Sequence, residues 1–214
     1  MTKQEIAESL LKIKAVDLDA KKGFVYASGR KGPIYCDNRL ILSYPAERDK
    51  IIEGFLYTIK EKNIVFDIVA GVATGGIAWA AILADRLKKP MVYIRAASKN
   101  HGKQNQIEGE LEEGKRILII EDLVNTGSSS VAACIALKEE SCTVAACIAV
   151  FNYSLKDAAK LFTKEKIPLY SLTDFSSLIK TAADAKYINA EGKKILMEWQ
   201  NNPKAWKPTL SGKD

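Results

Sequence analysis

Short apolar runs alternate with helical patterns through the middle of the chain, and this alternation restricts the fold more than any other feature. Strands are predicted at residues 64–70, 91–95, 116–122, 142–151 and 168–172. Helices are predicted at 77–87, 131–139 and 154–165, the last with Ser154 and Asp157 as a capping pair. Because the strands are apolar on both faces and alternate with helices, the sequence predicts an α/β fold with a mostly parallel sheet flanked by helices.

The segments on either side of this core are predicted to form a smaller lobe, which we call the hood. An N-terminal helix and an extended segment at 26–43 precede a helix with Pro45 in its first turn. One or two further helices are predicted near the C-terminus. We therefore expect a single domain over 1–214, with its core at about 45–172, a hood from about 1–44 and C-terminal helices at 173–207.

Composition excludes several classes of protein. An apolar share of 47% is enough for a core without disulfide or metal staples, and no apolar run is long enough to span a membrane. The charged, amphipathic N-terminus does not resemble a secretory signal. The cysteines lack metal-binding spacing and are expected to be free thiols in a cytoplasmic protein, at positions Cys36, Cys134, Cys142 and Cys147.

The net charge of +6 is compatible with two kinds of anionic partner. Nucleic-acid binding usually requires lysine and arginine clustered along one face or interleaved with aromatic residues. Here the lysines are spread through the chain, often beside acidic residues. The pattern therefore favours a small polyanionic substrate over a nucleic acid.

The most informative motif is an apolar strand that ends in two acids, Glu121 and Asp122, and continues into a loop of small polar residues at 125–130. A helix start presents unpaired N–H groups and the positive end of its dipole to an anion such as phosphate. Gly127 allows a close backbone approach, and the hydroxyls around it add donors. Carboxylates at the carboxyl end of a strand are suited to accept hydrogen bonds from sugar hydroxyls. Each part alone is compatible with a capped helix, but the ordered string indicates a sugar-phosphate site.

A second loop, Gly71–Gly76, follows the predicted strand at 64–70 and contains three glycines. Its backbone amides can turn toward an anion, although the loop alone indicates only a strand-to-helix turn. A third, polar and basic segment at 95–109 contains Arg95, Lys99 and the chain's only histidine, His101. A lone histidine is usually structural, but its place between lysines in a polar loop favours a functional role. Long loops of this kind often act as lids over a site.

Together these segments resemble the type I phosphoribosyltransferases, in which an apolar strand, two acids and a Thr-Gly loop bind phosphoribosyl pyrophosphate (PRPP). The Arg, Lys-x-His-Gly pattern at 95–109 and the segment Ser28–Arg39 are similar to the orotate phosphoribosyltransferase family. The resemblance covers roughly residues 24–130, and a Leu-x-x-Trp-x-x-x-Pro-x-x-Trp pattern at 196–206 is also similar to this family. It implies the type I phosphoribosyltransferase fold, with a hood built from the N-terminal segment.

The resemblance also implies the reaction and its residues. Orotate and PRPP would give orotidine 5'-monophosphate and pyrophosphate, a step of pyrimidine (UMP) biosynthesis, with Lys99, His101 and Arg95 as catalytic residues. No direct protein ligand to metal is expected, since Mg²⁺ would arrive with PRPP and be reached through water by Glu121 and Asp122. Orotate would be bound by Tyr35, Cys36, Arg39 and Asn125. PRPP would be bound by Thr74, Gly75, Arg95, Lys99, His101, Glu121, Asp122, Leu123, Val124, Asn125, Thr126, Gly127, Ser128 and Ser129.

In relatives the basic loop reaches a neighbouring subunit's site, so the resemblance implies a homodimer that shares loop 96–109. The chain departs from the family pattern at Ala27, Ala96, Asn125 and 151–153, which concern substrate contacts more than the reaction. Two alternatives remain open. A purine phosphoribosyltransferase should lack the basic loop pattern, and a PRPP-sensing regulator should carry a DNA-binding element; neither expectation fits this sequence.

Overall fold

The computed structural model describes residues 1–26, 29–95 and 106–209. A six-stranded sheet forms the centre of this described part, in the order β10-β9-β8-β5-β6-β7. Its neighbouring strands pair in parallel except β6 and β7, which are antiparallel, so the predicted mostly parallel sheet is confirmed. The strands are β5 (Ile68–Val72), β6 (Met91–Ile94), β7 (Ile107–Glu108), β8 (Arg116–Val124), β9 (Thr143–Asn152) and β10 (Leu169–Asp174).

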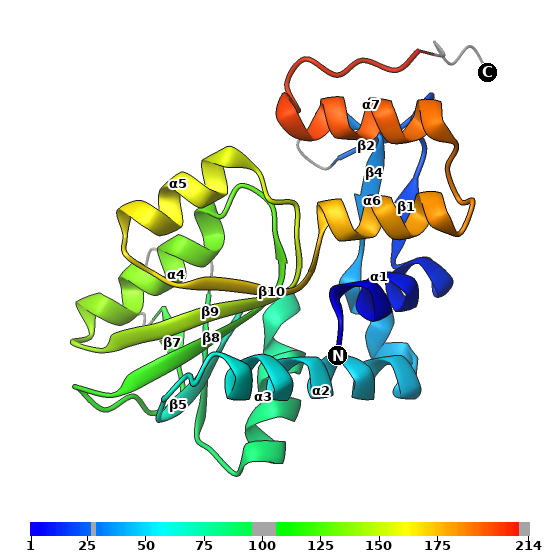
Figure 1. The fold of residues 1–214 in the computed structure, drawn as a ribbon. Coiled ribbons are helices and arrows are strands. Elements are labelled where there is room, and N and C mark those ends of the chain that lie inside the picture. The colour runs from blue at the N-terminus through cyan, green and yellow to red at the C-terminus, as the bar shows by residue number, and fades with distance from the viewer. Residues whose placement is uncertain (27–28, 96–105, 210–214) are drawn as a thin grey trace.

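Helices cover both faces of this sheet, as expected for buried parallel strands. They are α2 (Pro45–Glu61), α3 (Gly75–Leu87), α4 (Ser128–Glu139) and α5 (Lys156–Lys164). Figure 1 shows α4 and α5 on one face and α2 and α3 on the other. Along β8, Ile117 and Ile119 join the core beneath α4 and α5, whereas Leu118 and Ile120 join the core on the opposite face. This alternation sets the direction of the side chains that follow.

Both ends of the chain contribute to the hood (Figure 1). Its N-terminal elements are α1 (Lys3–Lys12), β1 (Val16–Leu18), β2 (Phe24–Val25), β3 (Lys31–Gly32), β4 (Ile34–Cys36) and the 3₁₀ helix η1 (Asn38–Ser43). Its C-terminal elements are α6 (Phe175–Asp184) and α7 (Ala190–Asn201). Strand β1 pairs with β4 and β2 with β3, both antiparallel. Helix α1 packs against α6, so segments far apart in the sequence build one lobe.

An aromatic cluster joins the hood to the carboxyl end of β9. Ring centroids of Phe151 and Tyr153 lie 5.1 Å apart, and those of Tyr153 and Trp199 lie 5.5 Å apart. Phe175, at the start of α6, is 5.5 Å from Trp199, and all four side chains are buried. Such pairs stabilise a fold beyond the area they bury. The cluster therefore fixes α6 and α7 against the core.

Two predictions about extended segments are wrong at their ends. The strand predicted at 64–70 begins only at Ile68, because Ile64 still donates its N–H to the Ile59 carbonyl after α2 and Val65 is exposed. The segment predicted as extended at 26–43 turns into η1 after Asp37. There the Asp37 carboxylate accepts the Arg39 N–H at 3.1 Å, which favours a helical turn.

The predicted capping pair of Ser154 and Asp157 is also wrong. Ser154 has a φ of +54°, its N–H donates to Asn152 Oδ1 at 2.8 Å, and Leu155 occupies the N-cap without a side-chain bond. Helices α3 and α4 begin earlier than predicted, at Gly75 and Ser128. Gly75 and Gly76, and the hydroxyl residues Ser128–Ser130, therefore lie in first helical turns.

Replacing Phe175 with alanine tests the aromatic cluster. Because the ring is fully buried against Trp199 and Tyr153, Phe175→Ala should lower the free energy of unfolding by about 3–5 kcal/mol. Urea denaturation measures this change. The exposed Tyr187, replaced in the same way, should change stability by no more than about 0.5 kcal/mol, and equal effects would contradict the role of the cluster.

Candidate active site

The two motif loops meet at one edge of the sheet. Strand β5 ends at Val72 and leads into the glycine loop, and its neighbour β8 ends at Val124 and leads into 125–129. Since parallel neighbours end at the same edge, both loops and the starts of α3 and α4 converge there. Of the residues predicted from sequence, Thr74, Gly75 and 121–129 are thereby brought together.

Close packing at the glycine loop depends on glycine, which has no side chain, at positions 75 and 76. A methyl group on Gly75 would overlap the Asp122 carboxylate, and one on Gly76 would overlap the Ile120 carbonyl oxygen. The loop is also tied to the next strand, because the Ala73 N–H donates to the Ile94 carbonyl at 2.8 Å. Glycine at these positions lets the start of α3 lie directly against β8. The carboxylate of Asp122 consequently faces the glycine loop.

The two adjacent acids point to opposite faces of the sheet, as strand alternation requires. Glu121 is 4% exposed and accepts a hydrogen bond from Ser130 Oγ at 2.8 Å, beneath α4. Asp122 is only half-buried and lies on the α3 face. One acid is thus held in the interior while the other is available to a ligand.

The environment of Glu121 favours its neutral form. Burial raises the pKa of this carboxyl well above its ordinary value, and the neighbouring Asp122 carboxylate raises it further. The hydrogen bonds from Ser130 Oγ and from the Asp122 N–H act in the opposite direction. Of the two adjacent acids, Glu121 is therefore the one whose negative charge is disfavoured.

The second loop exposes hydroxyl groups at a helix start. Gly127 has a φ of +80° and lies beneath Phe162 and Ala158, so a side chain there would be strained and crowded. Asn125, Thr126, Ser128 and Ser129 are exposed, whereas Val124 is buried and Leu123 half-buried. The hydroxyls of Thr126 and Ser128 lie 3.2 Å apart at the start of α4. Such an arrangement suits a phosphate group.

The hood supplies a third side of the site. Cys36, predicted to contact the substrate, is half-buried at the end of β4; burial raises the pKa of its thiol, and the Asp122 and Asp37 carboxylates raise it further. Tyr35 is 41% exposed. Arg39 is exposed and pairs with Asp37 at 2.7 Å. The segment predicted from sequence to contact orotate therefore approaches the same acid that faces the glycine loop.

Sequence reasoning missed Asn38. Its side chain is 1% exposed, and its Nδ2 donates to the main-chain oxygen of Asp122 at 2.6 Å. The contact joins residues 84 positions apart. An asparagine inside a polar segment gave no sign that it would be buried.

The predicted basic loop is described only at its two stems. Arg95 is half-buried after β6; its N–H donates to the Gln106 carbonyl at 2.8 Å and its guanidinium pairs with Glu108 at 2.8 Å. Lys99 and His101 lie outside the described residues, as does most of loop 96–109. The antiparallel pairing of β6 and β7 brings the stems together. Both stems of the loop therefore lie at β6, the strand next to β5, and β5 leads into the glycine loop.

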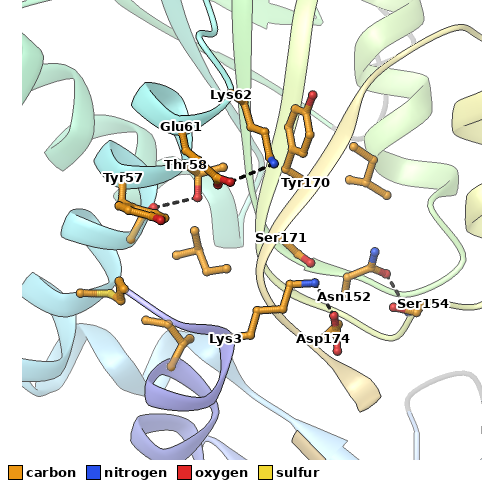
Figure 2. A pocket seen from close by; sticks show the side chains of 15 residues that line it. Lys3, Tyr57, Thr58, Glu61, Lys62, Asn152, Ser154, Tyr170, Ser171 and Asp174 are labelled. Atoms are coloured by element: carbon orange, nitrogen blue, oxygen red, sulfur yellow. Dashed lines mark hydrogen bonds and ion pairs between the residues drawn. The ribbon is translucent and has the colours of Figure 1, made fainter. Parts of the chain in front are cut away.

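A cavity of about 490 Å³ lies beside β10, the outermost strand on one side of the sheet, between this strand and helices α1 and α2 (Figure 2). Its lysines are already paired, Lys3 with Asp174 at 2.6 Å and Lys62 with Glu61 at 3.2 Å. Asn152 lines this cavity, and none of the predicted site residues does. The candidate site is therefore the edge around Asp122, despite the cavity elsewhere.

The four cysteines are free thiols, three of them buried, as predicted. Within residues 1–26, 29–95 and 106–209, no cluster of three or more histidine, cysteine, aspartate or glutamate side chains is arranged to hold a metal ion. None of the helices described is both long enough and apolar enough to cross a membrane.

Comparisons with known proteins agree with this geometry. A family model described as a phosphoribosyl transferase domain matches residues 42–179. An orotate phosphoribosyltransferase of Coxiella burnetii is 50% identical over 204 residues, which are 95% of this chain and 98% of that protein. One from Staphylococcus aureus is 45% identical over 199 residues, covering 93% of this chain and 98% of that protein.

Solved structures show the same fold. The orotate phosphoribosyltransferase of Aeropyrum pernix is 28% identical with a TM-score of 0.69, covering 82% of this chain and 97% of that one. An orotate phosphoribosyltransferase of Mycobacterium tuberculosis, solved in complex with PRPP, has a TM-score of 0.64 at 20% identity, covering 82% of this chain and 98% of that one.

Substituting Glu121 with glutamine tests the neutral acid. Because the folded protein holds the Glu121 pKa above its unfolded value, stability should fall as the pH rises from about 5 through the elevated pKa. Glu121→Gln has no such proton to lose. Its free energy of unfolding, relative to that of the parent protein, should therefore rise with pH by at least about 1.4 kcal/mol, the equivalent of one pKa unit. Urea denaturation at several pH values measures both curves, and parallel curves would contradict the assignment.

Proposed function

This chain belongs to the phosphoribosyl transferase family and, within it, to the orotate phosphoribosyltransferases; we propose that it transfers the phosphoribosyl group of PRPP to orotate at the edge around Asp122. The observation that carries this assignment is that two loops suited to bind anions meet beside Asp122, a half-buried acid that is available to a ligand. The start of α4 holds the 5'-phosphate. This group is remote from the reacting carbon, and its binding orients that carbon. The glycine loop at Thr74 and Gly75 receives the pyrophosphate, and Asp122 between them accepts hydrogen bonds from the ribose hydroxyls.

The chemical step is a displacement at C1 of the ribose. The orotate ring nitrogen loses its proton to solvent and forms a bond to C1, while the bond from C1 to the pyrophosphate oxygen breaks through an oxocarbenium-like transition state. Negative charge builds on the departing pyrophosphate, so positioned cations lower the barrier. Arg95, at the fixed stem of the basic loop, and Lys99 and His101 within it supply these charges, and a protonated His101 can deliver a proton to the leaving group.

Magnesium fits this arrangement. Mg²⁺ retains several waters and binds through one or two carboxylates together with substrate phosphates, and Asp122 offers a half-buried carboxylate beside the glycine loop. Bound together with PRPP, Mg²⁺ would supply positive charge to the pyrophosphate. Asp122 would hold the ion through its water ligands, whereas Glu121 supports the strand end from beneath α4.

Orotate is placed between the hood and the second loop. Tyr35 and Cys36 cover the ring from the hood, and Asn125 approaches from the loop after β8. Of the positions that depart from the family pattern, Asn152 lines the cavity in Figure 2 and Tyr153 is buried in the aromatic cluster. Among the exposed cations of segment Ser28–Arg39, Arg39 can meet the orotate carboxylate in exchange for its pairing with Asp37.

An absorbance assay of orotate loss tests the function. The purified protein should consume orotate only when both PRPP and Mg²⁺ are present, and removal of Mg²⁺ with a chelator should abolish the loss. Adenine, hypoxanthine and uracil serve as control bases and should not be converted. Turnover of a purine with no turnover of orotate would overturn the substrate assignment.

We also infer a homodimer in which loop 96–109 of one subunit acts at its partner's site. Each of Lys99→Ala and Asp122→Asn should lower kcat by about 100-fold to 1,000-fold, because each removes a group aimed at the transferred substrate. Lys99→Ala should change orotate binding far less than turnover. If sites are shared, mixing the two inactive variants under subunit exchange should restore part of the activity, since a hybrid dimer contains one intact site.

Mixing each variant with itself is the matched control and should restore nothing. Exchange is followed independently with differently tagged subunits. Demonstrated exchange without recovered activity would contradict shared sites.

A further inference from the structure

Asn38 is a buried polar side chain whose two hydrogen bonds both end at residues of the site. Its Nδ2 donates to the main-chain oxygen of Asp122 at 2.6 Å, and its Oδ1 accepts the Cys36 thiol at 3.3 Å. It is the first residue of η1, which packs against β8 and α3. One amide group therefore joins the hood segment above orotate to the strand end that faces PRPP.

The position of this bond along β8 makes it significant. Strand β8 pairs with β5 only as far as Ile120, but it remains paired with β9 as far as Val124. Beyond Ile120, the β5 chain has turned into the glycine loop, so β8 has a strand neighbour on one side only. Asn38 donates to the main chain of β8 within this singly supported stretch.

A second amide contact between hood and core does not support a singly paired stretch of strand. Gln200 Nε2 donates to the Tyr153 carbonyl at 3.0 Å, next to the aromatic cluster. Rings within that cluster already fix the same junction. Near Asp122, by contrast, the hood approaches through the short segment of β4 and η1, and Asn38 is its hydrogen-bonded contact with β8.

We propose that Asn38 is a positioning residue that sets the separation between the orotate-covering segment and Asp122. This inference rests on the proposed function. Orotate is covered from the hood, whereas the loops that bind PRPP belong to the core, and reaction requires the ring nitrogen and C1 in attack geometry. A buried amide whose Nδ2 and Oδ1 each have a protein partner is suited to fix such a separation, because neither bond can be exchanged for water without cost.

Two variants separate the donor from the volume of the side chain. Asn38→Ala removes both bonds, and Asn38→Asp keeps the shape but loses the donor to the Asp122 carbonyl. In both, kcat/KM for orotate should fall by about tenfold to a hundredfold, the effect of a small misplacement of reactants. The dissociation constant of PRPP alone should stay close to that of the parent protein, because its loops belong to the core.

Asn189→Ala is the matched control. Asn189 also lies in the hood, where its Oδ1 accepts the Gly192 N–H at 2.8 Å and caps α7. It should lower the melting temperature without changing kcat/KM for orotate. Melting curves and circular dichroism are recorded for every variant, so that a variant that fails to fold is recognised and the Asn38→Asp result is used in its place.

Three outcomes would overturn the proposal. Unchanged orotate kinetics in both Asn38 variants would show that the contact is not needed for positioning. Equal losses in PRPP binding and orotate use would indicate a general structural role, and so would losses that follow melting temperature as they do in Asn189→Ala. Failure of the parent protein to convert orotate is a separate result that would refute the proposed function itself.

Discussion

The close approach of Gly75 to Asp122 is the constraint on which the rest of the site depends. Because no methyl group fits between them, α3 can begin directly against β8 and the two loops share one edge of the sheet. Without this approach, the glycine loop and Asp122 would be separated by a side chain. Successive strand residues point to opposite faces of the sheet. Asp122 therefore faces the loop, whereas Glu121 points toward α4.

The sequence allowed prediction of the elements that depend on local pattern. The strand at 116–122 extends only two residues further in the structure, and the helix with Pro45 in its first turn was expected from proline's preference for that position. In the structure, the convergence of 71–76 with 121–129 follows from the parallel pairing of β5 with β8. The strand and the helix need only periodicity and turn chemistry.

Features that depend on distant contacts could not be predicted. Asn38 is buried because Asp122, 84 residues away, accepts its hydrogen bond. Ser154 does not cap α5 because its N–H is taken by Asn152 and its backbone turns left-handed. Strand alternation alone predicts that the two acids lie in different environments. The neutral form favoured at Glu121 could not be predicted, because it depends on the burial of this side chain and on the neighbouring Asp122 carboxylate.

The shared construction of the hood has a consequence for the order of folding. Helix α1 packs against α6, which lies about 170 residues later in the sequence, whereas the sheet is built from a continuous stretch in between. During synthesis on the ribosome, the first apolar segment emerges long before its partners exist. The packing of α1 against α6 therefore forms only after the strands of the sheet have been synthesised, so the hood is completed after the core strands that it covers.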